Sequence, residues 1–96
     1  MICQHRTYQV RTGVMDEFVA LFRDHLVPLR EAYGYEVLGA WNDPEDGTFV
    51  WVVGHEAPDG WDACEKAYYD SPERAAVPKD PKEFLESAET RLLQPV

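Results

Sequence analysis

The chain has 96 residues, enough for one domain built around a single hydrophobic core. Acidic residues outnumber basic ones by 18 to 9, which argues against a polyanionic partner such as nucleic acid or an anionic membrane. No apolar run approaches the ~20 residues of a membrane span, and the first residues lack the apolar core of a signal peptide. We therefore expect a cytoplasmic protein with no membrane and no nucleic-acid partner.

The first predicted element is a strand over residues 2–11. Successive side chains of a strand point to opposite faces, so the even-numbered residues share one face: Ile2, Gln4, Arg6, Tyr8 and Val10. The alternation is clearest at Tyr8 and Val10, and a turn at Thr12 and Gly13 leads out of the strand.

A long amphipathic helix is predicted between Gly13 and Gly34. Apolar residues recur there at helical spacing, namely Val14, Phe18, Leu21, Phe22, Leu26 and Leu29. Arg30 falls with the polar residues between them. Pro28 lacks a backbone N–H and crowds the preceding turn, so we expect a bend there. His25 lies on or beside the apolar stripe, one turn before that bend.

Two further strands, residues 35–42 and 48–56, flank a turn rich in Pro, Asp and Gly and so form a hairpin. If Asn42 pairs with Thr48, one face carries Tyr35, Val37, Gly39, Trp41, Phe49, Trp51, Val53 and His55. The other face carries Leu38, Ala40, Val50, Val52 and Gly54. Both faces are therefore apolar, whereas a solvated face should be polar. Helices cover only one face of a two-layer domain, so we expect a second copy of the chain to cover the other.

A second helix is predicted over residues 61–69, with Trp61, Cys64 and Tyr68 as its apolar stripe. Short helical turns begin at Pro72 and Pro81, and a last strand covers residues 89–94. The element order is that of a ferredoxin-like βαββαβ domain of the α+β class. We predict one domain over residues 1–96, with a four-stranded antiparallel sheet and helices on one face. Two copies paired through their sheets would form a dimeric α+β barrel.

The sequence resembles the NIPSNAP family within the dimeric α+β barrel superfamily. The matching stretches are RTY at 6–8 with Gly13, the helix from EF at 17–18 to LR at 29–30, VLGAW at 37–41, FVW at 49–51 and YDSPER at 69–74. The resemblance implies a homodimer with sheets packed face to face and a small-molecule cavity between each sheet and its helices. Related barrels include cofactor-free monooxygenases, haem-degrading enzymes, isomerases and proteins with no known reaction. The family offers no shared catalytic motif to transfer.

The candidate functional residues are histidine, aromatic and arginine side chains. His25 and Tyr68 are candidates for moving a proton in catalysis. The candidates for ligand binding are Arg6, Tyr8, Tyr35, Trp41, Trp51, His55 and Trp61. For the histidines the alternative is a structural role, and for the aromatic residues it is core or dimer packing. For Arg6 it is an ion pair with one of the many acids.

The sequence offers no pattern for a metal or a cofactor. The three histidines lack the spacing of a metal motif, and Cys3 and Cys64 form neither a metal knuckle nor a redox pair. No Gly-rich phosphate loop is present. We therefore expect no metal and no cofactor.

Two functional hypotheses follow. The first is a cofactor-independent enzyme for proton transfer, isomerisation, cyclisation or monooxygenation of a small apolar or aromatic molecule, bound between sheet and helices. The second is a non-catalytic dimer that binds a small ligand or another protein.

Overall fold

The computed structural model describes residues 1–96 and contains a four-stranded antiparallel sheet in the order β2–β3–β1–β4. The strands are β1 (Ile2–Val10), β2 (Glu36–Asp43), β3 (Thr48–His55) and β4 (Leu85–Leu93). The helical segments are α1 (Met15–Leu21), η1 (Phe22–Leu26), α2 (Val27–Ala32), α3 (Trp61–Tyr69), α4 (Pro72–Ala75) and η2 (Pro81–Phe84). None of these helices is both long enough and apolar enough to cross a membrane.

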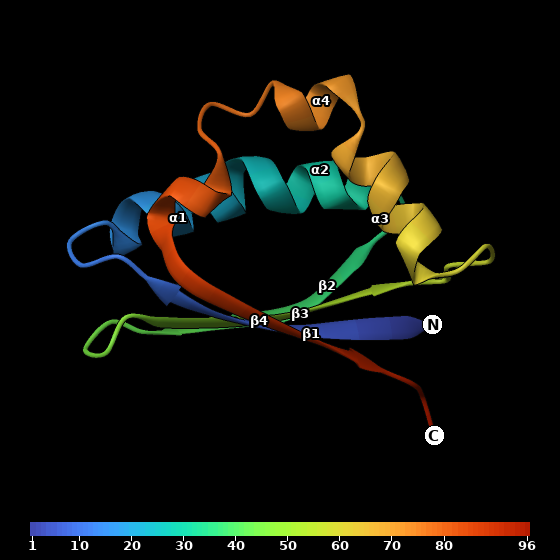
Figure 1. Ribbon diagram of the computed structural model, residues 1–96, viewed down its shortest axis with the longest axis horizontal. Coiled ribbons are helices and arrows are strands. Elements are labelled where there is room, and N and C mark those ends of the chain that lie inside the picture. The colour runs from blue at the N-terminus through green and yellow to red at the C-terminus, as the bar shows by residue number, and fades with distance from the viewer.

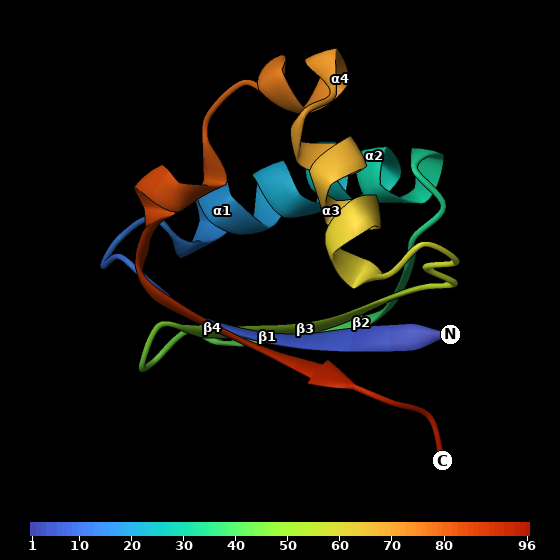
Figure 2. The same ribbon diagram turned by 45° about the vertical axis from the view of Figure 1, so that its right-hand side comes forward.

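All helices lie on one face of the sheet, and no element of the chain covers the other face (Figure 1). The turned view gives the same two layers, with α4 farthest from the sheet (Figure 2). This arrangement confirms the predicted ferredoxin-like α+β fold. The last strand is longer than predicted, because Leu85 already pairs with Val10 directly after the short 3₁₀ turn η2.

The core lies between the sheet and the helices and is dominated by aromatic rings. Phe22 meets Phe49 and Trp51 edge-on, with ring centroids 4.9 and 5.0 Å apart. Phe18 meets Phe49 in the same way at 5.0 Å and is fully buried. Full burial of one such aromatic side chain stabilises the fold by about 1.5–3 kcal/mol. This packing fixes the long helix on the inner face of β1 and β3.

The long helix contains a π-helical turn, η1, between α1 and α2. The backbone N–H of Val27 bonds to the carbonyl of Phe22, five residues earlier, instead of four. Pro28 follows at once and has no N–H to offer to the carbonyl of Asp24. The irregularity predicted at Pro28 is therefore realised one turn earlier, as a widened turn.

The widened turn decides which side chains of the helix face the sheet. A regular α-helix has 3.6 residues per turn, so side chains spaced four residues apart gradually rotate around the helix axis. A π-helical turn contains more residues and reverses part of this rotation, which keeps such side chains on one face. As a result one buried row continues over the whole helix: Phe18, Phe22, Leu26 and Arg30. The prediction was wrong at two positions. Arg30 is buried, with only 2% of its surface exposed, and His25 is exposed instead of lying beside the stripe.

The β2–β3 hairpin is shifted by one residue from the predicted pairing. Thr48 pairs with Asp43 instead of Asn42, because the Gly47 N–H bonds to the Asp43 carbonyl at 2.9 Å and makes Asp43 the last residue before the turn. An irregularity between Val37 and Gly39 then restores the predicted pairing of Val37 with Val53.

The shift moves Trp41 to the outer face of the sheet, where it pairs with Val50. Ala40, instead of the predicted Gly39, pairs with the inward-facing Trp51. Trp41 is 63% exposed, and Leu38, at the irregularity, is 48% exposed. The Trp41 indole lies over Gly39, where an added Cβ would stand 2.5 Å from the ring. The outer face thus exposes a large indole with nothing from this chain above it.

Candidate active site

A buried charged cluster joins three elements under the helices. Arg6 comes from β1, Arg30 from α2 and Glu65 from α3. Arg6 donates a 2.6 Å bond to Oε1 of Glu65, and Arg30 donates a 2.7 Å bond to Oε2. One carboxylate therefore bridges two guanidinium groups that come from opposite layers of the domain.

The local sequence explains each position. Strand alternation turns Arg6 inward together with Gln4 and Tyr8. The π-helical turn brings Arg30 onto the buried row. Glu65 lies four residues after the buried Trp61, so it falls on the inner stripe of α3.

Tyrosine hydroxyls surround this cluster. Arg6 donates to the hydroxyl oxygens of Tyr8 at 3.2 Å and Tyr69 at 3.3 Å, and Arg30 also donates to Tyr69, at 3.1 Å. Tyr35 donates its own hydroxyl proton to Glu65 at 3.0 Å. The Tyr69 oxygen thus accepts hydrogen bonds from two cationic groups at once.

Aromatic faces compensate part of the cost of burying Arg30. Its guanidinium carbon lies 3.9 Å from the ring centroid of Tyr68 and 4.6 Å from that of Tyr35. Such cation–π contacts contribute about 2 kcal/mol when the cation is desolvated. Arg74, from α4, stands 5.2 Å from the ring centroid of Tyr69 and so adds a third guanidinium on the same side.

The protonation states follow from this environment. Burial opposes the charge on Arg6, but the oxygens of Tyr8, Tyr69 and Glu65 raise its pKa above the ordinary value, so the cation persists. Burial raises the pKa of Tyr35, and Cys64 and Glu65 raise it further. Burial also raises the pKa of Tyr68, although nearby arginines oppose it. Both phenols are therefore neutral at physiological pH.

A cavity of about 30 Å³ lies beside this cluster, between sheet and helices. Its polar lining consists of Arg6, Arg30, Arg74, Tyr8, Trp51 and Tyr69, together with the ring of Tyr68 and apolar side chains. The space is enough for one or two waters or a small polar head group. The indole N–H of Trp51 is buried and has no hydrogen-bond partner. We call this space the arginine cavity.

The arginine cavity brings together four of the residues singled out in the sequence: Arg6, Tyr8, Trp51 and Tyr68. Tyr35 touches the cluster through Glu65, and Trp61 packs in the core against Tyr35, with centroids 5.9 Å apart. Trp41 lies on the other face of the sheet. His25 lies in an open surface depression with Pro28 and Glu73, away from the cavity.

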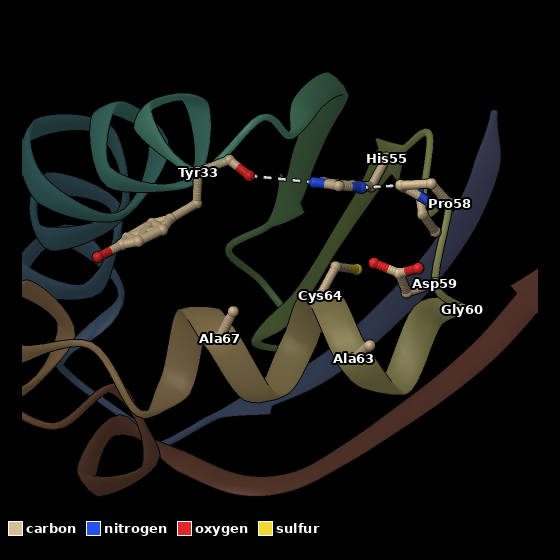
Figure 3. A pocket seen from close by; sticks show the side chains of 9 residues that line it. Tyr33, His55, Pro58, Asp59, Gly60, Ala63, Cys64 and Ala67 are labelled. Atoms are coloured by element: carbon tan, nitrogen blue, oxygen red, sulfur yellow. Dashed lines mark hydrogen bonds between the residues drawn. The ribbon is translucent and has the colours of Figure 1, made fainter.

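His55 lines a different and larger pocket, of about 230 Å³, at the end of β3 beside α3 (Figure 3). Its Nδ1 accepts a 2.8 Å hydrogen bond from the backbone N–H of Ala57, so the ring proton is on Nε2, which donates to the carbonyl of Tyr33 at 3.1 Å. Both ring nitrogens are thus occupied by backbone groups. His55 cross-links the end of β3 and the end of α2 through these two hydrogen bonds.

Four residues of the site were not singled out in the sequence: Arg30, Glu65, Tyr69 and Arg74. A usable signal existed for Glu65, because it lies four residues after the apolar Trp61, whereas Arg30 reaches the buried row only through the π-helical turn. No group of three or more His, Cys, Asp or Glu side chains is arranged to hold a metal ion.

No model of a protein family matches the sequence, and no curated protein matches it. Solved structures do match the fold. A NIPSNAP domain protein from Burkholderia xenovorans, itself uncharacterised, superposes with a TM-score of 0.83 at 20% identity over 100% of this chain and 95% of that one. A NIPSNAP family protein from Agrobacterium tumefaciens gives 0.83 at 20% identity over 99% and 92%.

A structure described as an antibiotic biosynthesis monooxygenase is similar at lower score, with a TM-score of 0.72 and 15% identity over 100% of this chain and 99% of that one. At sequence identities this low, the structural matches establish only that the fold is shared. The resemblance to NIPSNAP proteins seen in the sequence is therefore confirmed at the level of the fold.

Proposed function

We propose that this protein is a homodimer in which each subunit binds a small organic molecule that inserts one end into the arginine cavity. One observation carries the ligand-binding part. The cavity lies between the sheet and the helices, and Trp51, one of the residues that line it, has a buried indole N–H without a hydrogen-bond partner. Buried donors are nearly always satisfied, so an unpaired one beside a cavity suits an acceptor that a ligand supplies.

The dimer rests on the outer face of the sheet. Trp41 is exposed there, and Val50 and Val52 lie on the same apolar surface. Soluble monomers seldom expose contiguous apolar patches of this kind, and a second copy of the same sheet is the simplest cover. A dimer of ordinary size would bury about 800 Å² on each subunit.

The test of the binding function is a screen of small aromatic and aliphatic compounds by thermal shift and by intrinsic tryptophan fluorescence. Compounds that bind in the arginine cavity should raise the melting temperature and perturb Trp51. The control is the same titration on Trp51→Phe, in which the fluorescence change should shrink. If no compound in the screen binds the purified dimer, the proposal is wrong.

A second candidate function is cofactor-independent proton transfer on the bound molecule, and a specific observation favours Tyr69 as the group that moves the proton. The Tyr69 oxygen accepts from Arg6 and Arg30, so its own proton is free to be donated to an oxygen of the bound molecule while solvent water removes a proton from the neighbouring carbon. The two cations stabilise the negative charge that remains on Tyr69. Similar folds include a structure described as an antibiotic biosynthesis monooxygenase, which supports catalysis by analogy only.

Proton transfer predicts that the protein exchanges an acidic C–H of a bound compound with deuterium from solvent, measured by NMR. Tyr69→Phe should reduce this exchange to the rate in buffer while weakening binding by less than about tenfold, because one neutral hydrogen bond is lost. Exchange that persists in Tyr69→Phe would contradict the role of Tyr69.

A further inference from the structure

The charges around the arginine cavity run against the composition of the chain. The sequence has 9 basic and 18 acidic residues, yet three of the basic residues, Arg6, Arg30 and Arg74, line this one cavity and no acid does. Glu65 neutralises part of that charge from the side. The cavity wall therefore keeps an excess of positive charge, most of it removed from water.

Hydrogen-bond donors are also in excess there. Each guanidinium offers five N–H groups. Arg6 donates four side-chain hydrogen bonds, whereas Arg30 donates only two, to Glu65 and Tyr69. The indole N–H of Trp51, a residue only 3% exposed, makes none. Guanidinium and indole N–H groups donate and do not accept, so the missing partners must be acceptors. A negatively charged acceptor would satisfy both the donors and the unbalanced charge.

The volume of the arginine cavity and the side chains that line it restrict which anions can bind there. A space of about 30 Å³ takes the two oxygens of a carboxylate but not a whole organic ligand. The rest of the cavity wall is apolar and aromatic, from Phe18, Phe22 and Leu26. Tyr69, which is 43% exposed, and Arg74 give the cavity its less buried side, where the body of a ligand can continue outward.

We propose that the arginine cavity binds the carboxylate of a small organic acid with an apolar or aromatic body, through Arg6, Arg30, Arg74 and the indole N–H of Trp51. This inference rests on the proposed ligand-binding function and names the chemical class of its ligand. Planar two-oxygen anions match the forked geometry of arginine, which bonds them through parallel N–H groups.

The experiment compares acids with their uncharged isosteres by isothermal titration of the purified protein. The probes are benzoate, phenylacetate and hexanoate, each paired with its amide, with formate and inorganic phosphate as anions that lack an apolar body. At least one acid should bind at least about tenfold more tightly than its amide, because hydrogen bonds to a charged group are the stronger ones. Formate and phosphate should bind more weakly than that acid.

Two pairs of variants locate the binding. Trp51→Phe should weaken binding of the acid by about tenfold, while Trp61→Phe should not, although Trp61 also has a buried indole N–H without a partner. Arg74→Gln should weaken it several-fold, while Arg23→Gln, an exposed arginine elsewhere on the surface, should not. Thermal melting of each variant verifies that it is folded.

The outcomes separate the two proposals. If neutral compounds bind and no acid binds better than its amide, the carboxylate inference is overturned and the ligand-binding function stands. If phosphate or formate binds as tightly as any acid, the site is for a bare anion and the inference is likewise overturned. If neither acids nor neutral compounds bind, both proposals are wrong.

Discussion

The inner face of the sheet and the β2–β3 part of its outer face are both apolar, but they meet very different surroundings. The β1–β4 part of the outer face carries polar side chains such as His5, Thr7 and Glu89. The inner face carries Phe49 and Trp51 under the helices and ends at a buried cluster of two arginines and a glutamate. The outer face carries Trp41 and Val50 and has nothing of this chain above it. The inner face has an unpaired hydrogen-bond donor, the indole N–H of Trp51, and is therefore suited to a polar ligand. The exposed apolar side chains of the outer face are instead suited to contact with a second copy of the chain.

The largest expected effect concerns the inner face. Glu65→Leu would leave two buried guanidinium groups without their shared carboxylate and should lower the free energy of unfolding by about 3–5 kcal/mol. Urea denaturation at fixed protein concentration measures this change. Glu86→Leu, which removes an exposed glutamate of β4, should change it by less than about 0.5 kcal/mol. Similar effects in both variants would show that the cluster does not depend on its carboxylate.

The next effect concerns the outer face. Trp41→Lys places a charge on the exposed apolar surface and should raise the dimer dissociation constant by at least about 30-fold, as expected for loss of an aromatic hot spot. Sedimentation equilibrium gives this constant, and binding in the arginine cavity should persist. Glu45→Lys adds the same side chain in the hairpin turn and serves as the control. A Trp41→Lys protein with unchanged association would remove the outer face from the interface.

A smaller effect appears at alkaline pH and belongs to the inner face alone. The pKa values of Tyr35 and Tyr68 are raised chiefly by burial, so above about pH 10 the unfolded chain releases protons that the folded protein retains. The free energy of unfolding should therefore fall with rising pH, by up to about 1.4 kcal/mol per pH unit for each group. Denaturation between pH 9 and 11 should show a shallower fall in Tyr68→Phe. Equal slopes would contradict the assignment.

The smallest effect is expected at His25, which belongs to neither face. His25→Ala should change the free energy of unfolding by less than about 0.5 kcal/mol and leave binding in the arginine cavity unaltered, because the side chain is exposed and lies apart from it. Denaturation and titration measure the two quantities. A tenfold loss of binding would restore His25 as a functional residue.

The sequence predicted the fold and one part of the site for the same reason. Alternation along β1 and the stripe of α3 follow from regular geometry, so the sequence correctly put Arg6 and Tyr8 on one face of their strand and Tyr68 on the apolar stripe of its helix. No long-range information was needed for these positions.

The errors arose where the backbone departs from regular geometry. A π-helical turn reversed the expected places of Arg30 and His25, and a turn one residue tighter than assumed moved Trp41 to the other face. Periodicity assumes a constant repeat and cannot detect a single widened turn or a one-residue shift. Glu65 was overlooked because charged residues on helices usually face water, although its spacing from Trp61 placed it on the buried stripe.

A crystal structure of the protein grown with benzoate tests the contrast between the two faces most directly. The account predicts a carboxylate within hydrogen-bond distance of Arg30 and of the indole N–H of Trp51 on the inner face. It also predicts a second copy of the chain covering Trp41 on the outer face. An arginine cavity that holds only water, or a Trp41 left in solvent by a protein that is monomeric in solution, would contradict it.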